Sequence, residues 1–388
     1  MPIFYREGAR RCRAPELRLL HGLTDRISDH MEHEELYRQA HAFYAVLLRP
    51  LNNQLIMDLE VDSEHFLYTP YIPLPGTKNP FTLTAARLKN WMYDAVCQIE
   101  HRQFDDFYNK IVNDYRESAK RVDGYLHSLS RHIPAPPQVT REIHWFHTKG
   151  RSELYARLAM TIIRRIDSGE FDSQKYLPSI PRLMEEYGVM KNTASRAVSL
   201  LNHLGFARTL DKKGTVIAIK ENTAGRENID LAAPIIQERL TLFMNALQII
   251  SLTARNCAAS FSSIPEDLLP FMERRLMYAS DSRVSPLSIQ PIMKCFVQMI
   301  PCHSLKNIFQ QMEELIIWGY YLQAVDPVFS PDSCCAATAM KELAAALRTQ
   351  DQAVIANAYG NAFTLVYEDV CRIVSQIPGC SCLLPDRQ

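Results

Sequence analysis

Apolar residues recur with the period of an α-helix along both outer parts of the chain. Between residues 88 and 99 they stand at positions i, i+3, i+4 and i+7, the pattern of a helix with one apolar face. The same spacing recurs at residues 104–115, 340–347 and 354–370. Strict alternation of apolar and polar residues, which indicates a half-buried strand, is nearly absent from these parts. Both outer parts are therefore predicted to be all-helical.

Two stretches without this periodicity divide the chain. Residues 132–138 contain three prolines, which lack a backbone N–H donor and do not continue a helix. Residues 220–228 are polar, follow neither period and contain a glycine. With 388 residues, the chain is long enough for two or three separate cores. We therefore predict three domains, at residues 1–140, 141–222 and 223–388.

The two outer domains resemble each other in one segment. Residues 43–56 align with residues 296–309 when one insertion is allowed. Both segments begin with Phe, space their apolar residues about one helical turn apart, and continue through an Asn to two further apolar residues. An internal duplication is one interpretation, and coincidental helical patterning is the other.

The central domain follows a different pattern. Residues 152–168, 179–187 and 191–204 predict three helices, the second capped by Ser179 and separated from the third by a glycine turn. Two short strands follow within residues 206–219, joined by a polar hairpin tip. This is the order of a winged helix-turn-helix, in which the helix after the turn enters the DNA major groove. The predicted fold class is mainly α, with this central winged helix-turn-helix (three helices plus a β-hairpin) flanked by two all-helical domains.

The distribution of charge singles out the central domain. The whole chain balances 43 Lys+Arg against 43 Asp+Glu, and its 47% apolar and 22% charged residues exclude disordered and collagen-like chains. Residues 141–220, however, hold 14 basic and 8 acidic residues, net +6, while residues 1–140 and 221–388 are net −1 and −5. A local excess of positive charge on a winged helix favours double-stranded DNA as the partner.

The start of the third central helix holds the side chains best suited to read base edges. Arginine and lysine pair with guanine and asparagine with adenine, while basic residues at the hairpin tip, residues 211–214, neutralise phosphates or enter the minor groove. The predicted core residues on the opposite side of the helix are Ala194, Ala197, Val198 and Leu201. The candidate DNA-binding residues are Ser179, Arg182, Lys191, Asn192, Thr193, Ser195, Arg196, Lys212, Lys213 and Gly214.

The central domain also carries a family resemblance, which rests on an ordered set of residues. The set is Leu154-Tyr155…Ile162-x₃-Ile166-x₂-Gly169, Leu177-Pro178-Ser179-x₃-Leu183, Gly188-Val189-x₃-Thr193-x₃-Ala197-x₂-Leu200, Gly205 and Gly214-Thr215-Val216. This set resembles the GntR superfamily of bacterial transcription regulators, and the all-helical flanking domains resemble its FadR-type subfamily. The resemblance implies a repressor that binds an operator as a homodimer. It also implies a small effector, of unknown identity, bound in a helical domain.

Several positions differ from the family pattern. Ile180 and Pro181 stand where the family has Glu-Arg, and Met190-Lys191 stands where it has Ser-Arg. A helix turns about 100° per residue, so Arg196, which is shifted by one position, does not simply replace an arginine at position 195. These differences leave an alternative open, a protein-interaction or scaffold protein whose winged helix no longer reads an operator.

Other chemistries have little support in the sequence. The ten cysteines lack the paired spacing of a zinc site and are predicted to be reduced thiols, with a redox switch at Cys380 and Cys382 as the alternative. His30 and His33 beside Asp29 form the one histidine pair considered for a metal, and their flanking acids favour a solvated surface. No phosphate loop or nucleophile elbow is recognisable. We predict a protein that is not an enzyme and binds no metal or cofactor.

The sequence also predicts the compartment. The N-terminus is too charged for the apolar core of a signal peptide. No apolar run approaches the roughly 18 residues of a membrane span. The expected location is therefore cytoplasmic, with no membrane partner.

Overall fold

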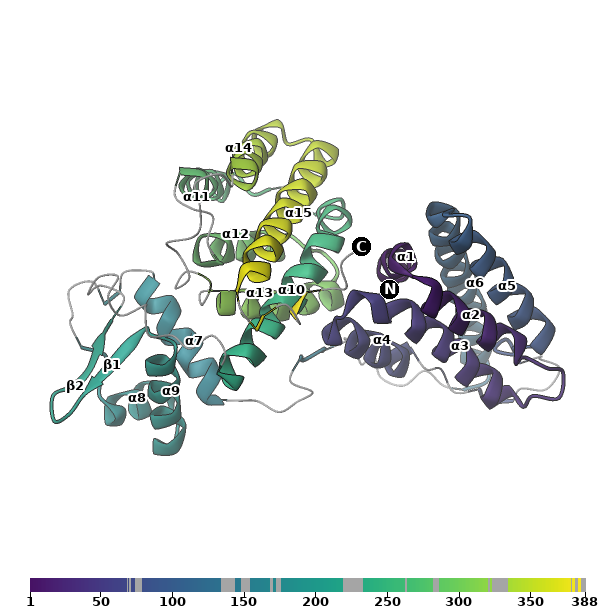
Figure 1. Cartoon of the computed structure of the whole chain (residues 1–388), viewed down its shortest axis with the longest axis horizontal. Helices are drawn as coiled ribbons and strands as arrows, with labels where there is room; N and C mark the ends of the chain where they lie inside the picture. Colours follow the sequence, from purple (N-terminus) through teal and green to yellow (C-terminus); the bar gives the residue numbers. More distant parts are fainter. Residues whose placement is uncertain are drawn as a thin grey trace. The chain divides into compact units, whose positions relative to one another are not determined.

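A computed structural model shows a mainly helical chain (Figure 1). The structure describes residues 1–67, 69, 71–73, 79–133, 144–147, 154–167, 170–171, 176–218, 233–261, 264–281, 286–319, 322, 334–377, 379–380 and 383–384. The predicted linker at 220–228, most of the linker at 132–138, and Cys382 lie outside them. The chain divides into two compact units, Met1–Ile143 with Leu384–Gln388, and His144–Leu383. The three predicted domains and their boundaries stay predictions.

The first unit is a helical bundle. Its elements are α1 (Pro2–Arg11), α2 (Ala14–Asp25), α3 (His33–Leu48), the 3-10 turn η1 (Arg49–Leu51), α4 (Gln54–Leu67), α5 (Ala85–Glu100) and α6 (Phe104–Ser130). The fully buried core side chains include Leu20, Phe43, Leu47, Ile56, Met92 and Phe107. Helix α1 approaches α3 very closely, because a Cβ built on Gly8 would lie 1.7 Å from the carbonyl oxygen of Leu47. A residue without a side chain is therefore required at position 8.

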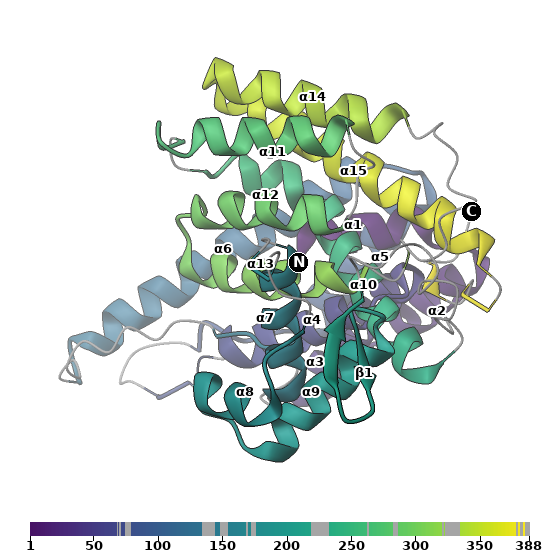
Figure 2. The same ribbon diagram turned by 90° about the vertical axis from the view of Figure 1, so that its left-hand side faces the viewer.

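The second unit contains another bundle. Its helices are α10 (Pro234–Ala258), α11 (Leu269–Asp281), α12 (Pro286–Gln298), α13 (His303–Ile316), α14 (Cys334–Thr349) and α15 (Gln352–Gln376). Helices α14, α11, α12 and α13 pack in that order, each against the next, and α13 packs on α10 (Figure 2). Helix α15 lies along both α14 and α10 and so closes the ring. The aromatic rings of Phe261 and Phe296 stack within this core, and the Tyr359 ring contacts both at an angle.

The second unit also holds the winged helix-turn-helix. Its helices are α7 (Leu154–Asp167), α8 (Ile180–Tyr187) and α9 (Lys191–His203), and its hairpin strands are β1 (Ala207–Leu210) and β2 (Gly214–Ile217). The strands are antiparallel, with Ala207 opposite Ile217 and Leu210 opposite Gly214. A third extended segment joins this small sheet, because Tyr176 bridges to Val216 and the Leu177 N–H donates to the Thr215 carbonyl over 2.8 Å. The predicted fold class is confirmed.

The structure also settles several smaller expectations. The predicted helical patterns at 88–99, 104–115, 340–347 and 354–370 fall within α5, α6, α14 and α15. Gly214, predicted at the hairpin tip, begins β2 instead. The two segments suggested as a duplication each run from one helix into the next, α3 into α4 and α12 into α13, but the duplication itself stays a prediction.

Within the described residues, no helix is both long and apolar enough to cross a membrane.

Candidate DNA-binding site

The turn between α8 and α9 is set by backbone chemistry. Pro181 lies in the first turn of α8, where its missing N–H is not needed. Gly188 ends the helix at φ +60°, in the left-handed region, and its N–H donates to the Met184 carbonyl. Glycine adopts that conformation without the steric penalty of a side chain. The predicted glycine turn is therefore present, and it fixes where α9 begins.

One expectation about α8 is wrong in its detail. Ser179 does occupy the N-cap position, but its hydroxyl makes no capping hydrogen bond to α8. Ser179 and Arg182 are both exposed at this end of the helix. The Ser179 hydroxyl and the Arg182 guanidinium are thus placed to contact solvent or a ligand at the start of α8.

Helix α9 separates into a buried face and an exposed face, as predicted. Its buried side chains, all less than 9% exposed, are Ala194, Ala197, Val198, Leu200 and Leu201. Lys191, Asn192 and Arg196 are exposed, and Thr193 and Ser195 are half-buried. The first turn of α9 therefore presents a lysine and an amide to solvent above a fixed apolar core.

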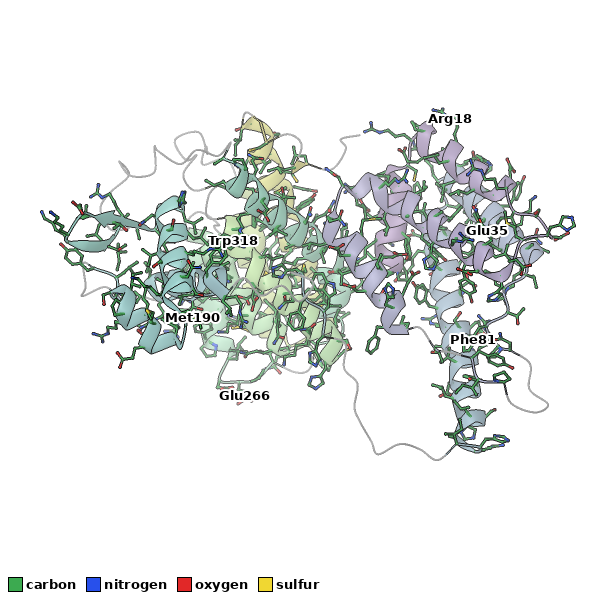
Figure 3. All side chains as sticks on the ribbon, turned by 90° about the horizontal axis from the view of Figure 1, so that it is seen from below. Arg18, Glu35, Phe81, Met190, Glu266 and Trp318 are labelled. Carbon is green, nitrogen blue, oxygen red and sulfur yellow. The ribbon has the colours of Figure 1, made fainter. Side chains whose placement is uncertain are left out.

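Met190 precedes these residues and was not among the predicted site residues. It occupies the N-cap position of α9 without a side-chain cap, and its side chain is 81% exposed (Figure 3). An apolar side chain at a position that usually holds Ser, Thr, Asp or Asn could have been noticed in the sequence. Its place at the entry to α9 allows an apolar contact with DNA, such as a thymine methyl group.

Arg196 is oriented by an aromatic ring from another helix. Its guanidinium carbon lies 3.9 Å from the centre of the Tyr155 ring on α7. Stacking uses the face of the guanidinium and leaves its N–H donors, which lie in the plane, for other partners. Within the described part of the chain, the side chains of the other candidates make no hydrogen bond, ion pair or ring contact. Tyr155, which is 41 residues away, belongs to the family pattern, but nothing in the sequence indicates that it contacts Arg196.

Part of the positive charge of the central segment is used internally. The Arg165 guanidinium donates to both Glu170 oxygens over 2.8 and 2.6 Å, and also to Glu186 and the Tyr187 hydroxyl. These hydrogen bonds hold the end of α7 against the end of α8, raise the pKa of Arg165 and lower the pKa of Glu170. Arg165 is therefore a structural residue, and it adds nothing to the charge available to DNA.

The hairpin is tied to the end of α9. The Asn202 amide donates to the Thr209 hydroxyl over 2.7 Å, and that hydroxyl lies 3.1 Å from the Thr215 hydroxyl. At the tip, Lys212 has φ +54°, and Lys212 and Lys213 are both exposed. The wing therefore holds two lysines at a defined position relative to α9, where they can neutralise phosphates.

Comparison with known proteins agrees with this geometry. Residues 154–217, which run from the start of α7 to the end of β2, match the gntR family of bacterial regulatory proteins. Among solved structures, one titled Streptococcus agalactiae GntR is similar, with 15% sequence identity, a TM-score of 0.24, and coverage of 55% of this chain and 99% of that chain. No curated protein matches the sequence.

The site and the fold together define a DNA-binding module of the winged helix-turn-helix class. More particularly, residues 154–217 are a GntR-family helix-turn-helix domain, and that domain points to a bacterial transcription regulator. The family resemblance found in the sequence is confirmed for this segment. Its FadR-like subtype stays a prediction.

Proposed function

We propose that the protein is a cytoplasmic, FadR-like bacterial repressor without enzymatic activity, which binds operator DNA as a homodimer under the control of a small effector. The observation that carries this proposal is the GntR-family domain, whose α9 exposes Lys191 and Asn192 above a buried apolar face. The ten candidate residues lie at the start of α8, on α9 and on the wing, the parts of a winged helix that meet DNA. No finding favours the alternative of a degenerate scaffold protein.

The polar interior of the α10–α15 bundle supports an effector site there. Arg239 is 6% exposed and stacks 5.0 Å from the Trp318 ring, and Gln290 donates to the Glu313 carbonyl over 3.4 Å. Gln248, which lies on α10 as Arg239 does, is 2% exposed. Buried polar side chains inside a helical bundle are what a site for a small polar ligand requires.

The segment that precedes α7 in the sequence is hydrogen-bonded to this bundle. The backbone N–H of Trp145 donates to the side-chain oxygen of Asn307 over 2.6 Å, and Nδ1 of His147 lies 3.0 Å from the side-chain oxygen of Gln311. Asn307 and Gln311 stand one turn apart on α13. An effector that prefers one arrangement of α13 would shift the segment preceding α7, and so the spacing of the two α9 helices in a dimer.

DNA retardation tests the proposed function. DNA carrying the protein's own upstream region should be retarded at low salt. Its affinity should fall by roughly 10³-fold or more between about 50 and 200 mM salt, because counterions released from phosphates drive such binding. Absence of retardation at low salt, with protein that circular dichroism shows to be folded, would contradict the proposal.

The assembly state is a separate expected result. A symmetric operator requires two copies of α9 related by a two-fold axis. Light scattering at micromolar concentration should therefore give twice the chain mass of 44.5 kDa. A mass of one chain under these conditions would rule out the homodimer.

A further inference from the structure

Three side chains of the first unit bring potential metal ligands together, well away in sequence from the DNA-binding domain. His41 lies on α3, and Glu60 and Glu64 lie one turn apart on α4, so both carboxylates project from the same face. One ligand atom of each lies within 4.8 Å of the others, and a His41 ring nitrogen is 2.6 Å from a Glu64 oxygen. Among the described residues, this is the one group of three such ligands.

Glu60 gives a second and independent indication of a bound cation. Glu60 is only 5% exposed, and its buried Oε1 atom accepts no hydrogen bond. A buried carboxylate oxygen without a partner is costly, and proteins usually pair such a group or use it to coordinate a metal. The buried Oε1 atom of Glu60 therefore offers a ligand atom for a cation.

The surroundings supply no cationic side chain beyond His41. Three tyrosine side chains, those of Tyr5 on α1, Tyr44 on α3 and Tyr115 on α6, lie close enough to Glu60 to interact with it electrostatically. In the described residues, no lysine or arginine forms an ion pair with Glu60 or Glu64. Neutral phenols can donate hydrogen bonds to carboxylates, but they do not balance two negative charges.

We propose that His41, Glu60 and Glu64 bind one first-row divalent metal ion, such as Zn²⁺ or Mn²⁺. One imidazole nitrogen and two carboxylate oxygens are a suitable donor set for these ions, and water completes the coordination. The His41 and Glu64 side chains are 45% and 39% exposed, which leaves the ion a path from solvent. The bound ion links α3 to α4 through its ligands and balances the negative charge of the buried Glu60 carboxylate. This site goes beyond the proposed DNA-binding function.

Titration calorimetry with Zn²⁺ tests the site on the full chain after treatment with a chelator. The parent should bind one ion per chain. His41→Gln and Glu64→Gln should each weaken Zn²⁺ binding by about 100-fold or more, because loss of a residue that only hydrogen-bonds to a metal ligand already lowers metal affinity by about 10–100-fold. The control is His65→Gln on α4, an exposed histidine outside the cluster, which should leave the affinity unchanged. Zn²⁺ should also raise the unfolding temperature of the parent but not of the two ligand variants.

Two further measurements keep the test decisive. Because the chain has ten cysteines, Co²⁺ is added to the parent, and its spectrum should lack the intense near-ultraviolet bands of thiolate ligands. If either variant fails to fold by circular dichroism, Glu60→Gln, which keeps the shape of the side chain, replaces it with the same expectation. Any of three results would overturn the proposal. The parent binds no stoichiometric ion, its Co²⁺ spectrum shows thiolate bands, or the folded ligand variants bind Zn²⁺ as tightly as the parent.

Discussion

A variant with Lys191, Arg196, Lys212 and Lys213 all changed to alanine should fold as the parent does and lose operator binding. Removing a side chain of α9 that pairs with a base edge costs about 1–3 kcal/mol of binding free energy. The two wing lysines are expected to bind the phosphate backbone, so their removal should weaken binding to every sequence and flatten its salt dependence. Fluorescence anisotropy with labelled operator and with unrelated duplex, at several salt concentrations, separates the two contributions.

A control variant removes the same charge elsewhere. Its four alanine substitutions replace the exposed residues Arg116, Lys120, Arg274 and Lys294 of the two helical bundles. This control should bind operator with the affinity of the parent. The contradicting result is that the variant lacking Lys191, Arg196, Lys212 and Lys213 folds and binds DNA as the parent does. In that case these residues only interact with solvent, and the assignment of the DNA-binding residues is wrong.

Gly8→Ala should destabilise the first unit by about 3 kcal/mol or more, the upper range for overpacking. The added Cβ would lie 1.7 Å from the Leu47 carbonyl oxygen, and backbone on both sides has to move to make room. Hydrogen exchange followed by mass spectrometry measures the effect in the intact chain. Amides of α1 and α3 should exchange about 100-fold faster or more, while the α10–α15 bundle keeps its protection.

Gly124→Ala is the matched control for this change. Gly124 is exposed within α6, and a Cβ there meets no atom within 4 Å. The substitution should stabilise the helix by about 0.5–1 kcal/mol, because alanine has the higher helix propensity. Equal exchange rates in the two variants would contradict the close packing of α1 on α3.

Local patterns predicted the elements of this fold well. The period of apolar residues located α5, α6, α14 and α15, and it also separated the buried and exposed faces of α9. Glycine turn chemistry located the boundary between α8 and α9 through Gly188. These features depend on residues within one or two turns of each other, which a sequence displays directly.

Contacts between distant elements could not be predicted in the same way. The stacking of Arg196 on Tyr155 and the pairing of Tyr176 with Val216 join segments that are about 40 residues apart in the sequence. His30 and His33 are a candidate metal pair in the sequence because they are close together along the chain. The structure instead uses His33 to contact the backbone at Phe81 and brings His41 to two glutamates from the next helix.

Photo-crosslinking tests most directly whether α9 lies in the DNA major groove. A crosslinking amino acid replaces the exposed Asn192 on α9 or, as a control, Tyr278 on α11, whose side chain is 61% exposed. With operator DNA at low salt, the protein labelled at position 192 should crosslink to the DNA, and the protein labelled at position 278 should not. If retardation of the DNA persists while position 192 gives no crosslink, α9 is not the element that reads DNA.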